Sequence, residues 1–289
     1  MSDTLLISFS GGCTSAYMTH MLLQHRATLP YKNIKVVFAN TGCEDERTLD
    51  FIHKCDVELN FGTVWVEGET QPEKGKGMLP HVVSYETAAR NGEPFERMIA
   101  KGGIPNVKRA LCTKDLKERT ITNYMRNLGH KRGSYYTAIG IRADEVHRVS
   151  ARMEEYKIVY PLVEWWPTTK QDALDFWSRQ SFDLGIKEYE GNCLFCFKKS
   201  WRKLLTLAKE RPEVFDFPLR MEEKYSKMAI GEGKEPPFHF YRGNRSTRQL
   251  LDEASTGNFK PWTANIKAPD PVLDAPNGCS ESCEIYPEK

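Results

Sequence analysis

The sequence predicts an α/β fold in which a parallel sheet is flanked by helices, followed by a mostly helical and irregular C-terminal region. Residues 4–9 (TLLISF) and 34–39 (IKVVFA) are short apolar runs, and each leads into a polar turn that contains glycine. Buried parallel strands have this pattern. Beyond about residue 181 the strand–helix alternation stops. We therefore expect an α/β domain over 1–180 and a separate region over 181–289, which contains several of the cysteines.

The other predicted elements follow in chain order. Apolar residues cluster after Ser15 and predict a helix that covers the sheet; they are Ala16, Met18, Met21, Leu22 and Leu23. The remaining elements are a helix over 46–55 and strands over 62–66, 134–141 and 157–160. Residues 68–107 are rich in Gly, Pro and Lys, and we expect a long insertion there with a short helix at 84–90.

The C-terminal region shows one clear helical signal. Trp201, Leu204, Leu205 and Ala208 are spaced i, i+3, i+4 and i+7, which predicts a helix with one buried face. Trp201 is then a core residue and not a stacking platform for bases. Between residues 260 and 276 four prolines predict an extended segment.

Composition excludes several broad classes. The chain has 289 residues, of which 40% are hydrophobic and 28% charged, and no apolar run approaches the roughly 18 residues of a membrane span. The first residues lack the basic region of a secretory signal, so a cytoplasmic protein without a membrane partner is expected. Eight cysteines are too few for a disulfide scaffold, and clustered thiols in a reducing compartment more often bind metal or do chemistry.

The segment Ser10-Gly11-Gly12-Cys13-Thr14-Ser15 lies where the first predicted strand ends and a helix begins. Its glycines allow a tight turn, and its N–H groups can face a phosphate or sulfate at the helix N-terminus. The loop lacks the lysine of a Walker A motif and the spacing of GxGxxG. A plain glycine turn with Ser15 as N-cap is the alternative. The loop resembles the SGGxxS signature of PP-loop enzymes.

Further segments resemble the 3′-phosphoadenylyl-sulfate (PAPS) reductase family, in matching order over about residues 5–200. They are Asn40-Thr41-Gly42 with Glu46 and Thr48, Cys112-Thr113 with Lys117, Gly140-Ile141-Arg142-Ala143-Asp144-Glu145, and Tyr160-Pro161-Leu162 with Trp165. SYETAARNGEPFE and CTKDLK narrow the resemblance to reductase-like proteins of phages and prophages.

This resemblance implies a Rossmann-like PP-loop fold (adenine nucleotide alpha hydrolase-like) that binds ATP, PAPS or adenylyl sulfate (APS). The implied nucleotide-binding residues are Ser10, Gly11, Gly12, Cys13, Thr14, Ser15, Asn40, Thr41, Gly42, Gly140, Arg142 and Glu145. As catalytic residues we expect Arg142, which suits a bidentate grip on an oxyanion, and Lys117; Arg148 is an alternative second charge. Glu145 orients Arg142 or holds Mg²⁺. An ordinary solvated set of ion pairs is the competing interpretation.

Two loop positions depart from the family pattern. Thr14 stands where an aspartate is usual, and Cys13 replaces a common basic residue. The loop has therefore lost both charged side chains. We expect the nucleotide to be held mainly by backbone N–H groups and by Arg142.

The CxxC at Cys193–Cys196 is half of a metal site by spacing. Cys112 lies in the motif that carries cluster ligands in iron–sulfur members of the family, so the resemblance implies a [4Fe–4S] cluster on Cys112, Cys193 and Cys196. Cys283 or Cys279 is the expected fourth ligand, unless that position is open. Zn²⁺ and buried apolar thiols are alternatives. Cys283 is also a candidate nucleophile, and no role is predicted for Cys43 and Cys55.

Two basic segments flank the predicted cysteine site. Residues 108–132 hold eight Lys or Arg against two acids, and 198–211 hold six against one. They favour a nucleic acid (tRNA or DNA) or a partner protein, with solvated surface as the alternative. The leading hypothesis is an ATP pyrophosphatase that acts in sulfur transfer and takes sulfur from a donor. The alternatives are a sulfonucleotide reductase that uses thioredoxin and releases sulfite, and a non-catalytic nucleotide-binding module.

Overall fold

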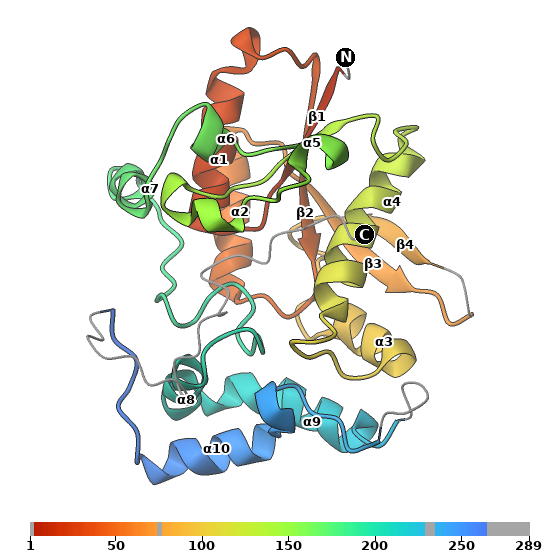
Figure 1. Cartoon of the computed structure of the whole chain (residues 1–289), viewed down its shortest axis with the longest axis vertical. Helices are drawn as coiled ribbons and strands as arrows, with labels where there is room; N and C mark the ends of the chain where they lie inside the picture. The colour runs from red at the N-terminus through yellow and green to blue at the C-terminus, as the bar shows by residue number, and fades with distance from the viewer. Residues whose placement is uncertain (1–2, 74–76, 229–234, 265–289) are drawn as a thin grey trace.

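Six strands form one mostly parallel sheet in the order β4-β3-β2-β1-β5-β6 (Figure 1). The computed structural model describes residues 3–73, 77–228 and 235–264. The strands are β1 (Thr4–Ser8), β2 (Asn33–Asn40), β3 (Val64–Thr70), β4 (Met78–Val83), β5 (Tyr136–Ala138) and β6 (Ile158–Val159). The pairs β1–β2, β2–β3, β1–β5 and β5–β6 are parallel, whereas β3–β4 is antiparallel. The predicted mixed α/β class with a largely parallel sheet is confirmed.

The strand order reverses between β1 and β5. The chain runs from β1 outward through β2 and β3, and it then returns to β5 on the other side of β1. In open α/β sheets, ligands bind at such a switch point, just outside the carboxyl ends of the strands. A ligand site is therefore expected at the turns that follow β1 and β5.

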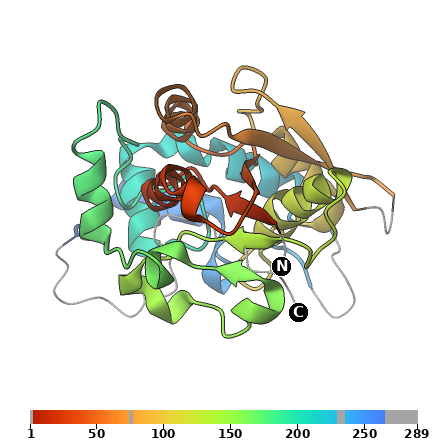
Figure 2. The same cartoon turned by 90° about the horizontal axis from the view of Figure 1, so that it is seen from above.

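Helices cover both faces of the sheet (Figure 2). One face packs on α1 (Cys13–Gln24), α2 (Glu46–Leu59), α6 (Pro161–Glu164) and α7 (Lys170–Trp177). The other face packs on α4 (Thr120–Asn127) through Leu6, Val37, Ile121 and Met125. Leu5 and Ile7 belong to the first core and Leu6 to the second, because successive side chains of a strand point to opposite faces.

Residues 68–107, the predicted long insertion, contain regular structure. Part of it forms β4, which pairs with β3 at the edge of the sheet, and α3 (Glu93–Gly102). Residues 84–90 form turns instead of the predicted helix. Pro80 obscured the strand signal because proline has no N–H, but an edge strand tolerates it. Pro94 occupies the first turn of α3, where its missing N–H costs nothing.

Short helical elements complete the fold. A π-helix, η2 (Cys112–Arg119), leads directly into α4, and α5 (Met153–Tyr156) precedes β6. The 3₁₀ turns are η1 (Arg26–Thr28), η3 (Ala143–Arg148), η4 (Pro212–Phe215) and η5 (Arg242–Asn244). In the described part of the chain, no helix combines the length and apolarity that a membrane crossing requires.

The C-terminal region forms a helical layer beyond the carboxyl ends of β1, β2 and β3 (Figure 1). It consists of α8 (Trp201–Glu210), α9 (Asp216–Tyr225) and α10 (Thr247–Thr256), and its described residues contain no strand. Trp201 is 4% exposed, so its predicted core position is confirmed. Most of the predicted extended tail, from residue 265 onward, lies outside the described residues.

Candidate functional site

The loop between β1 and α1 is held by its own serines. Gly12 caps α1, and Ser15 lies in the first turn, so the alternative in which Ser15 is the N-cap is wrong. The Ser15 hydroxyl donates to the Gly12 carbonyl at 3.0 Å and lies 2.9 Å from the Ser10 hydroxyl. Gly11 has φ +79°, and a Cβ there would lie 2.7 Å from Thr48 Cγ2. The loop therefore needs glycine at position 11.

Arg142 reaches this loop from the turn after β5. Its side chain is 6% exposed, and Nη1 donates to Thr14 Oγ1 at 3.0 Å. Nε donates to Asp144 Oδ1 at 2.9 Å, and Nη2 lies 3.4 Å from Glu145 Oε2. Arg148 pairs with the same Glu145 at 2.6 Å. The structure thus brings the predicted Arg142 and Thr14 into contact across the switch point.

Two further features hold this contact in place. A Cβ on Gly140 would lie 3.1 Å from Ser15 Cα, so the absence of a side chain lets the turn after β5 approach the loop. Burial alone would raise the pKa of Asp144, but the hydrogen bond and the charge of Arg142 lower it. Asp144 therefore stays ionised and keeps the guanidinium oriented.

Side-chain hydrogen bonds stabilise the predicted Asn40-Thr41-Gly42 turn. Asn40 Nδ2 donates to Glu67 Oε1 at 2.6 Å and to the Ala89 carbonyl at 2.8 Å. The Thr41 N–H donates to Glu44 Oε2 at 2.9 Å. Lys117 Nζ lies 3.7 Å from Glu44 Oε1, so this predicted catalytic lysine faces the turn after β2. The N–H groups of Gly42 and Cys43 likewise donate to Asn40 Oδ1 and Glu44 Oε2, so the turn satisfies its own backbone donors.

The CxxC loop contacts both turns. Asn192, next to Cys193, donates from Nδ2 to the Ser10 carbonyl at 2.9 Å, and its own carbonyl accepts from the Asp45 N–H at 2.9 Å. Cys193 forms an isolated antiparallel bridge with Glu44. The Cys196 N–H donates to the Cys193 carbonyl at 3.3 Å, which closes a tight turn between the two cysteines. The CxxC loop and the loop between β1 and α1 are therefore direct neighbours.

Cys43 belongs to the apolar cluster that also contains Phe195 of the CxxC loop, and Cys112 packs against the same cluster. Burial raises the pKa of the Cys43 thiol, and the neighbouring Cys193, Glu44 and Cys112 raise it further. Sequence reasoning missed Cys43, although it directly follows the Asn40-Thr41-Gly42 turn.

The remaining cysteine and metal predictions have different outcomes. Cys279 and Cys283 lie outside the described residues. Within 3–73, 77–228 and 235–264, no group of three or more His, Cys, Asp or Glu side chains is arranged to hold a metal ion. Cys55 lies in α2 and belongs to the sheet core. The predicted cluster on Cys112, Cys193 and Cys196 stays a prediction.

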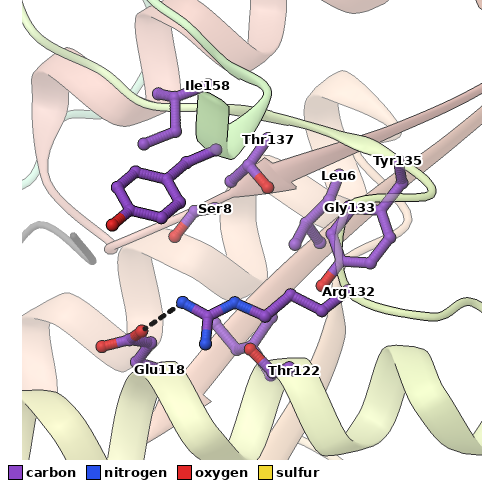
Figure 3. Close-up of a pocket in the computed structure, with 11 residues that line it drawn as sticks. Leu6, Ser8, Glu118, Thr122, Arg132, Gly133, Tyr135, Thr137 and Ile158 are labelled. Atoms are coloured by element: carbon purple, nitrogen blue, oxygen red, sulfur yellow. Dashed lines mark ion pairs between the residues drawn. The ribbon is translucent and has the colours of Figure 1, made fainter. Parts of the chain in front are cut away.

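Among the cavities of the described part of the chain, two adjoin the sheet near the turns considered above. One, of ≈ 200 Å³, adjoins the loop between β1 and α1 and is lined by Cys13, Asn192, Lys170 and Lys187, among others. The other, of ≈ 50 Å³, lies between β1, β5 and α4 (Figure 3). In it Arg132 pairs with Glu118 at 3.7 Å, across from Ser8 and Thr137 on the sheet. The second cavity is far smaller than a nucleotide, whereas the first extends the space beside the loop.

Several Lys and Arg side chains of the two basic segments make contacts within the folded structure. Arg202 is 6% exposed and donates to the Lys260 carbonyl at 2.9 Å. Lys203 Nζ lies 4.7 Å from the centre of the Trp262 ring, and Arg119 pairs with Asp115 at 2.6 Å. Part of the positive charge of the two basic segments is therefore engaged in contacts within the protein. The expected nucleic-acid or protein partner stays a prediction.

Comparison with known proteins gives a phage relative. No protein-family model matches the chain. The chain is 32% identical over 288 residues to the uncharacterized nin region protein ORF290 of Escherichia phage lambda. The alignment covers 97% of this chain and 94% of the phage protein. The similarity therefore extends over both the sheet and the helical layer.

Proposed function

The chain belongs to the same family as the nin region protein ORF290 of phage lambda, and we propose that it is a PP-loop ATP pyrophosphatase-type enzyme. It binds an adenine nucleotide and acts in sulfur transfer with a cysteine-bound iron–sulfur cluster, as a member of the PAPS reductase family. One juxtaposition carries the proposal. Arg142 donates to Thr14 at 3.0 Å and Asn192 donates to Ser10 at 2.9 Å, so an anion loop, a buried arginine and a cysteine loop adjoin at the switch point.

The loop is suited to phosphate. The N–H groups at the start of α1, a helix of 12 residues, have no intrahelical acceptor and can donate to an anion. The guanidinium of Arg142 stabilises the negative charge that develops when the bond between the α- and β-phosphates breaks. Thr14 takes part by accepting a hydrogen bond from Arg142, which offers a physical reason for a hydroxyl where an aspartate is usual.

The contacts of Glu145 favour a role in orienting Arg142 over a role in binding Mg²⁺. It forms ion pairs with Arg142 at 3.4 Å and with Arg148 at 2.6 Å, so its carboxylate is already shared by two guanidinium groups. A Mg²⁺ ion would then be bound mainly by the nucleotide phosphates and water. Lys117 supplies positive charge at the turn after β2.

The position of the CxxC loop supports the part of the proposal that concerns sulfur transfer. The pairing of Glu44 with Cys193 joins the cysteine loop to the turn that follows β2. When bound there, a cluster would supply iron that carries the incoming sulfur atom. The basic segments 108–132 and 198–211 favour a nucleic acid as acceptor.

The first experiment measures nucleotide affinity, which requires no knowledge of the acceptor. We expect ATP to bind the wild-type protein and Arg142→Ala to weaken binding about 100-fold, as loss of a buried charged donor costs roughly 3 kcal/mol. Thr14→Val should weaken it a few-fold, since it removes only the acceptor that orients Arg142. Arg152→Ala, at a side chain that is 43% exposed, is the control. Equal affinities for wild type and Arg142→Ala would contradict the proposal.

Products separate the competing functions. Pyrophosphate released from ATP supports the proposed enzyme, whereas sulfite released from PAPS or APS supports a reductase. Nucleotide binding without turnover of any of the three, with tRNA, DNA, thioredoxin and a sulfide donor present, would leave a binding module.

A further inference from the structure

We infer that Asn192 is a positioning residue of the proposed nucleotide site, because its side-chain amide holds the peptide group between Ser10 and Gly11 with the Gly11 N–H available to a phosphate. The inference rests on the proposed function and deepens it. It assigns one anion contact to a single peptide group and the orientation of that group to a residue beside the CxxC. Neither the SGGxxS signature nor the family resemblance gives Asn192 a role.

The amide of Asn192 fixes the direction of one carbonyl group. Asn192 is 8% exposed, and its Nδ2 donates to the Ser10 carbonyl at 2.9 Å. In a trans peptide the carbonyl and the following N–H point in opposite directions. The Gly11 N–H therefore points away from Asn192. If this peptide group turned over, an electronegative oxygen would replace the N–H and would repel an anion.

The loop needs such a contact because glycine itself does not fix the peptide. Gly11 has φ +79°, and glycine adopts positive and negative φ with similar ease. Ser15 holds the other side of Ser10, since the Ser10 N–H donates to Ser15 Oγ at 3.3 Å. The hydrogen bond from Asn192 holds the side that leads to Gly11.

The two glycine N–H groups are left for a ligand. Gly11 and Gly12 are buried, and within the described residues neither N–H donates a hydrogen bond. A buried N–H group without an acceptor costs free energy, which a bound anion recovers. Arg142 brings positive charge to the same loop through its hydrogen bond to Thr14 at 3.0 Å.

The backbone at Asn192 is held independently of its side chain. Its carbonyl accepts from the Asp45 N–H at 2.9 Å, and the next residue, Cys193, pairs with Glu44. Substitution of the Asn192 side chain leaves both contacts in place. Variants at this position should therefore fold with the CxxC loop beside the sheet.

The test measures the affinity of ATP and of pyrophosphate by calorimetry at pH 8 and pH 5. Asn192→Ala should weaken both about tenfold, because it removes the donor to the Ser10 carbonyl. Asn192→Asp should weaken both further at pH 8, where its carboxylate has no proton to donate and repels the phosphates. Burial raises the pKa of such a carboxyl group, and at pH 5 its protonated form can donate to Ser10. The affinity relative to the wild type should then recover to within about threefold.

A matched control and a comparison at pH 5 isolate the hydrogen bond. Asn258→Asp makes the same chemical change at an exposed position and should bind like the wild type at both pH values. At pH 5 Asn192→Asp should bind ATP more tightly than Asn192→Ala. Equal affinities of these two variants would overturn the inference, since relief of charge repulsion would then explain the recovery.

The remaining outcomes separate this inference from the proposed function. Circular dichroism and urea unfolding establish that each variant is folded, and either folded Asn192 variant suffices for the comparison at pH 8. Wild-type affinity in the Asn192 variants, with weakened binding in Arg142→Ala, would overturn the inference and leave the proposed function intact. A wild type that binds neither ATP nor pyrophosphate would overturn both.

Discussion

Single side chains decide how charge reaches the loop between β1 and α1. Cys13 and Thr14 carry no charge, and a positive group reaches the loop from Arg142, which is distant in sequence. Arg142 is held by Asp144 and by Glu145 as well as by Thr14. A charge fixed in this way needs no rearrangement when a phosphate arrives. The absence of charged side chains at positions 13 and 14 is therefore compatible with the proposed cleavage of a nucleotide phosphate bond.

Gly11 is expected to be essential for stability. Gly11→Ala forces a residue with a side chain to φ +79° and brings its Cβ within 2.8 Å of Ile52 Cδ1. The left-handed conformation costs about 1 kcal/mol and overpacking adds roughly 1–3 kcal/mol. Urea denaturation should show a fall of about 2–4 kcal/mol in the free energy of unfolding.

Gly62→Ala isolates the conformational contribution. Gly62 has φ +61°, and a Cβ there meets nothing within 4 Å. This variant should lose only about 1 kcal/mol. Equal losses at positions 11 and 62 would mean that Thr48 and Ile52 move aside without cost, so that steric contact does not explain the glycine.

At the scale of elements, one ionic cluster joins α2, α8 and the segment before the CxxC. Asp45 caps the N-terminus of α2 and accepts hydrogen bonds from Arg47 and Arg211, each within 3.0 Å. Glu190 pairs with the same two arginines at 2.8 and 3.2 Å. The Asp45 side chain is 4% exposed. Because the cluster lies beside Asn192, it fixes the approach of the cysteine loop to the sheet.

This cluster predicts an acid-sensitive contribution to stability. Burial would raise the pKa of Asp45, but hydrogen bonds from Arg47 and Arg211 outweigh it and hold the pKa at about 2. The native carboxylate therefore keeps its charge at lower pH than the unfolded one, whose pKa is near 3.9. The stabilisation, up to about 2.5 kcal/mol, is present above pH ~4 and lost as the pH falls towards 2.

Asp45→Asn tests this assignment because asparagine preserves the helix cap while removing the charge. Its unfolding free energy should lie about 1–2.5 kcal/mol below wild type at pH 7, with the difference shrinking between pH 4 and 2. Asp252→Asn, at an exposed position of α10, should follow the wild-type curve. A constant difference for Asp45→Asn at every pH would show that the ionised form contributes nothing.

The central elements were predictable because their signals are local. Apolar runs and glycine turns predicted β1 and β2, and helical periodicity predicted α1 and α8. β4 was not predicted, since Pro80 and an exposed edge remove the usual strand pattern. The place of Cys43 was not predictable for a different reason. Its approach to Cys193 depends on a pairing between segments about 150 residues apart, which no local pattern encodes.

For the whole molecule, the important feature is an apolar cluster shared across the predicted boundary near residue 180. Phe95 of α3 packs edge-on against Phe195 and Phe217, with ring centres 5.7 and 5.8 Å away. Phe195 and Phe217 come from the C-terminal region, whereas α3 packs beside β3. Cys43 belongs to this shared cluster, and Cys112 packs against it. The integrity of the cluster therefore depends on both regions together.

Shared packing predicts that the sheet and the helical layer unfold together. Phe95→Ala removes a side chain that is 2% exposed, and the cavity should cost about 3–5 kcal/mol. Far-ultraviolet circular dichroism and tryptophan fluorescence should report one coincident transition in both wild type and variant. Phe38→Ala, in the sheet core, should lower the same transition by a similar amount. Two separate transitions, of which each substitution moves only one, would instead establish independent domains divided near residue 180.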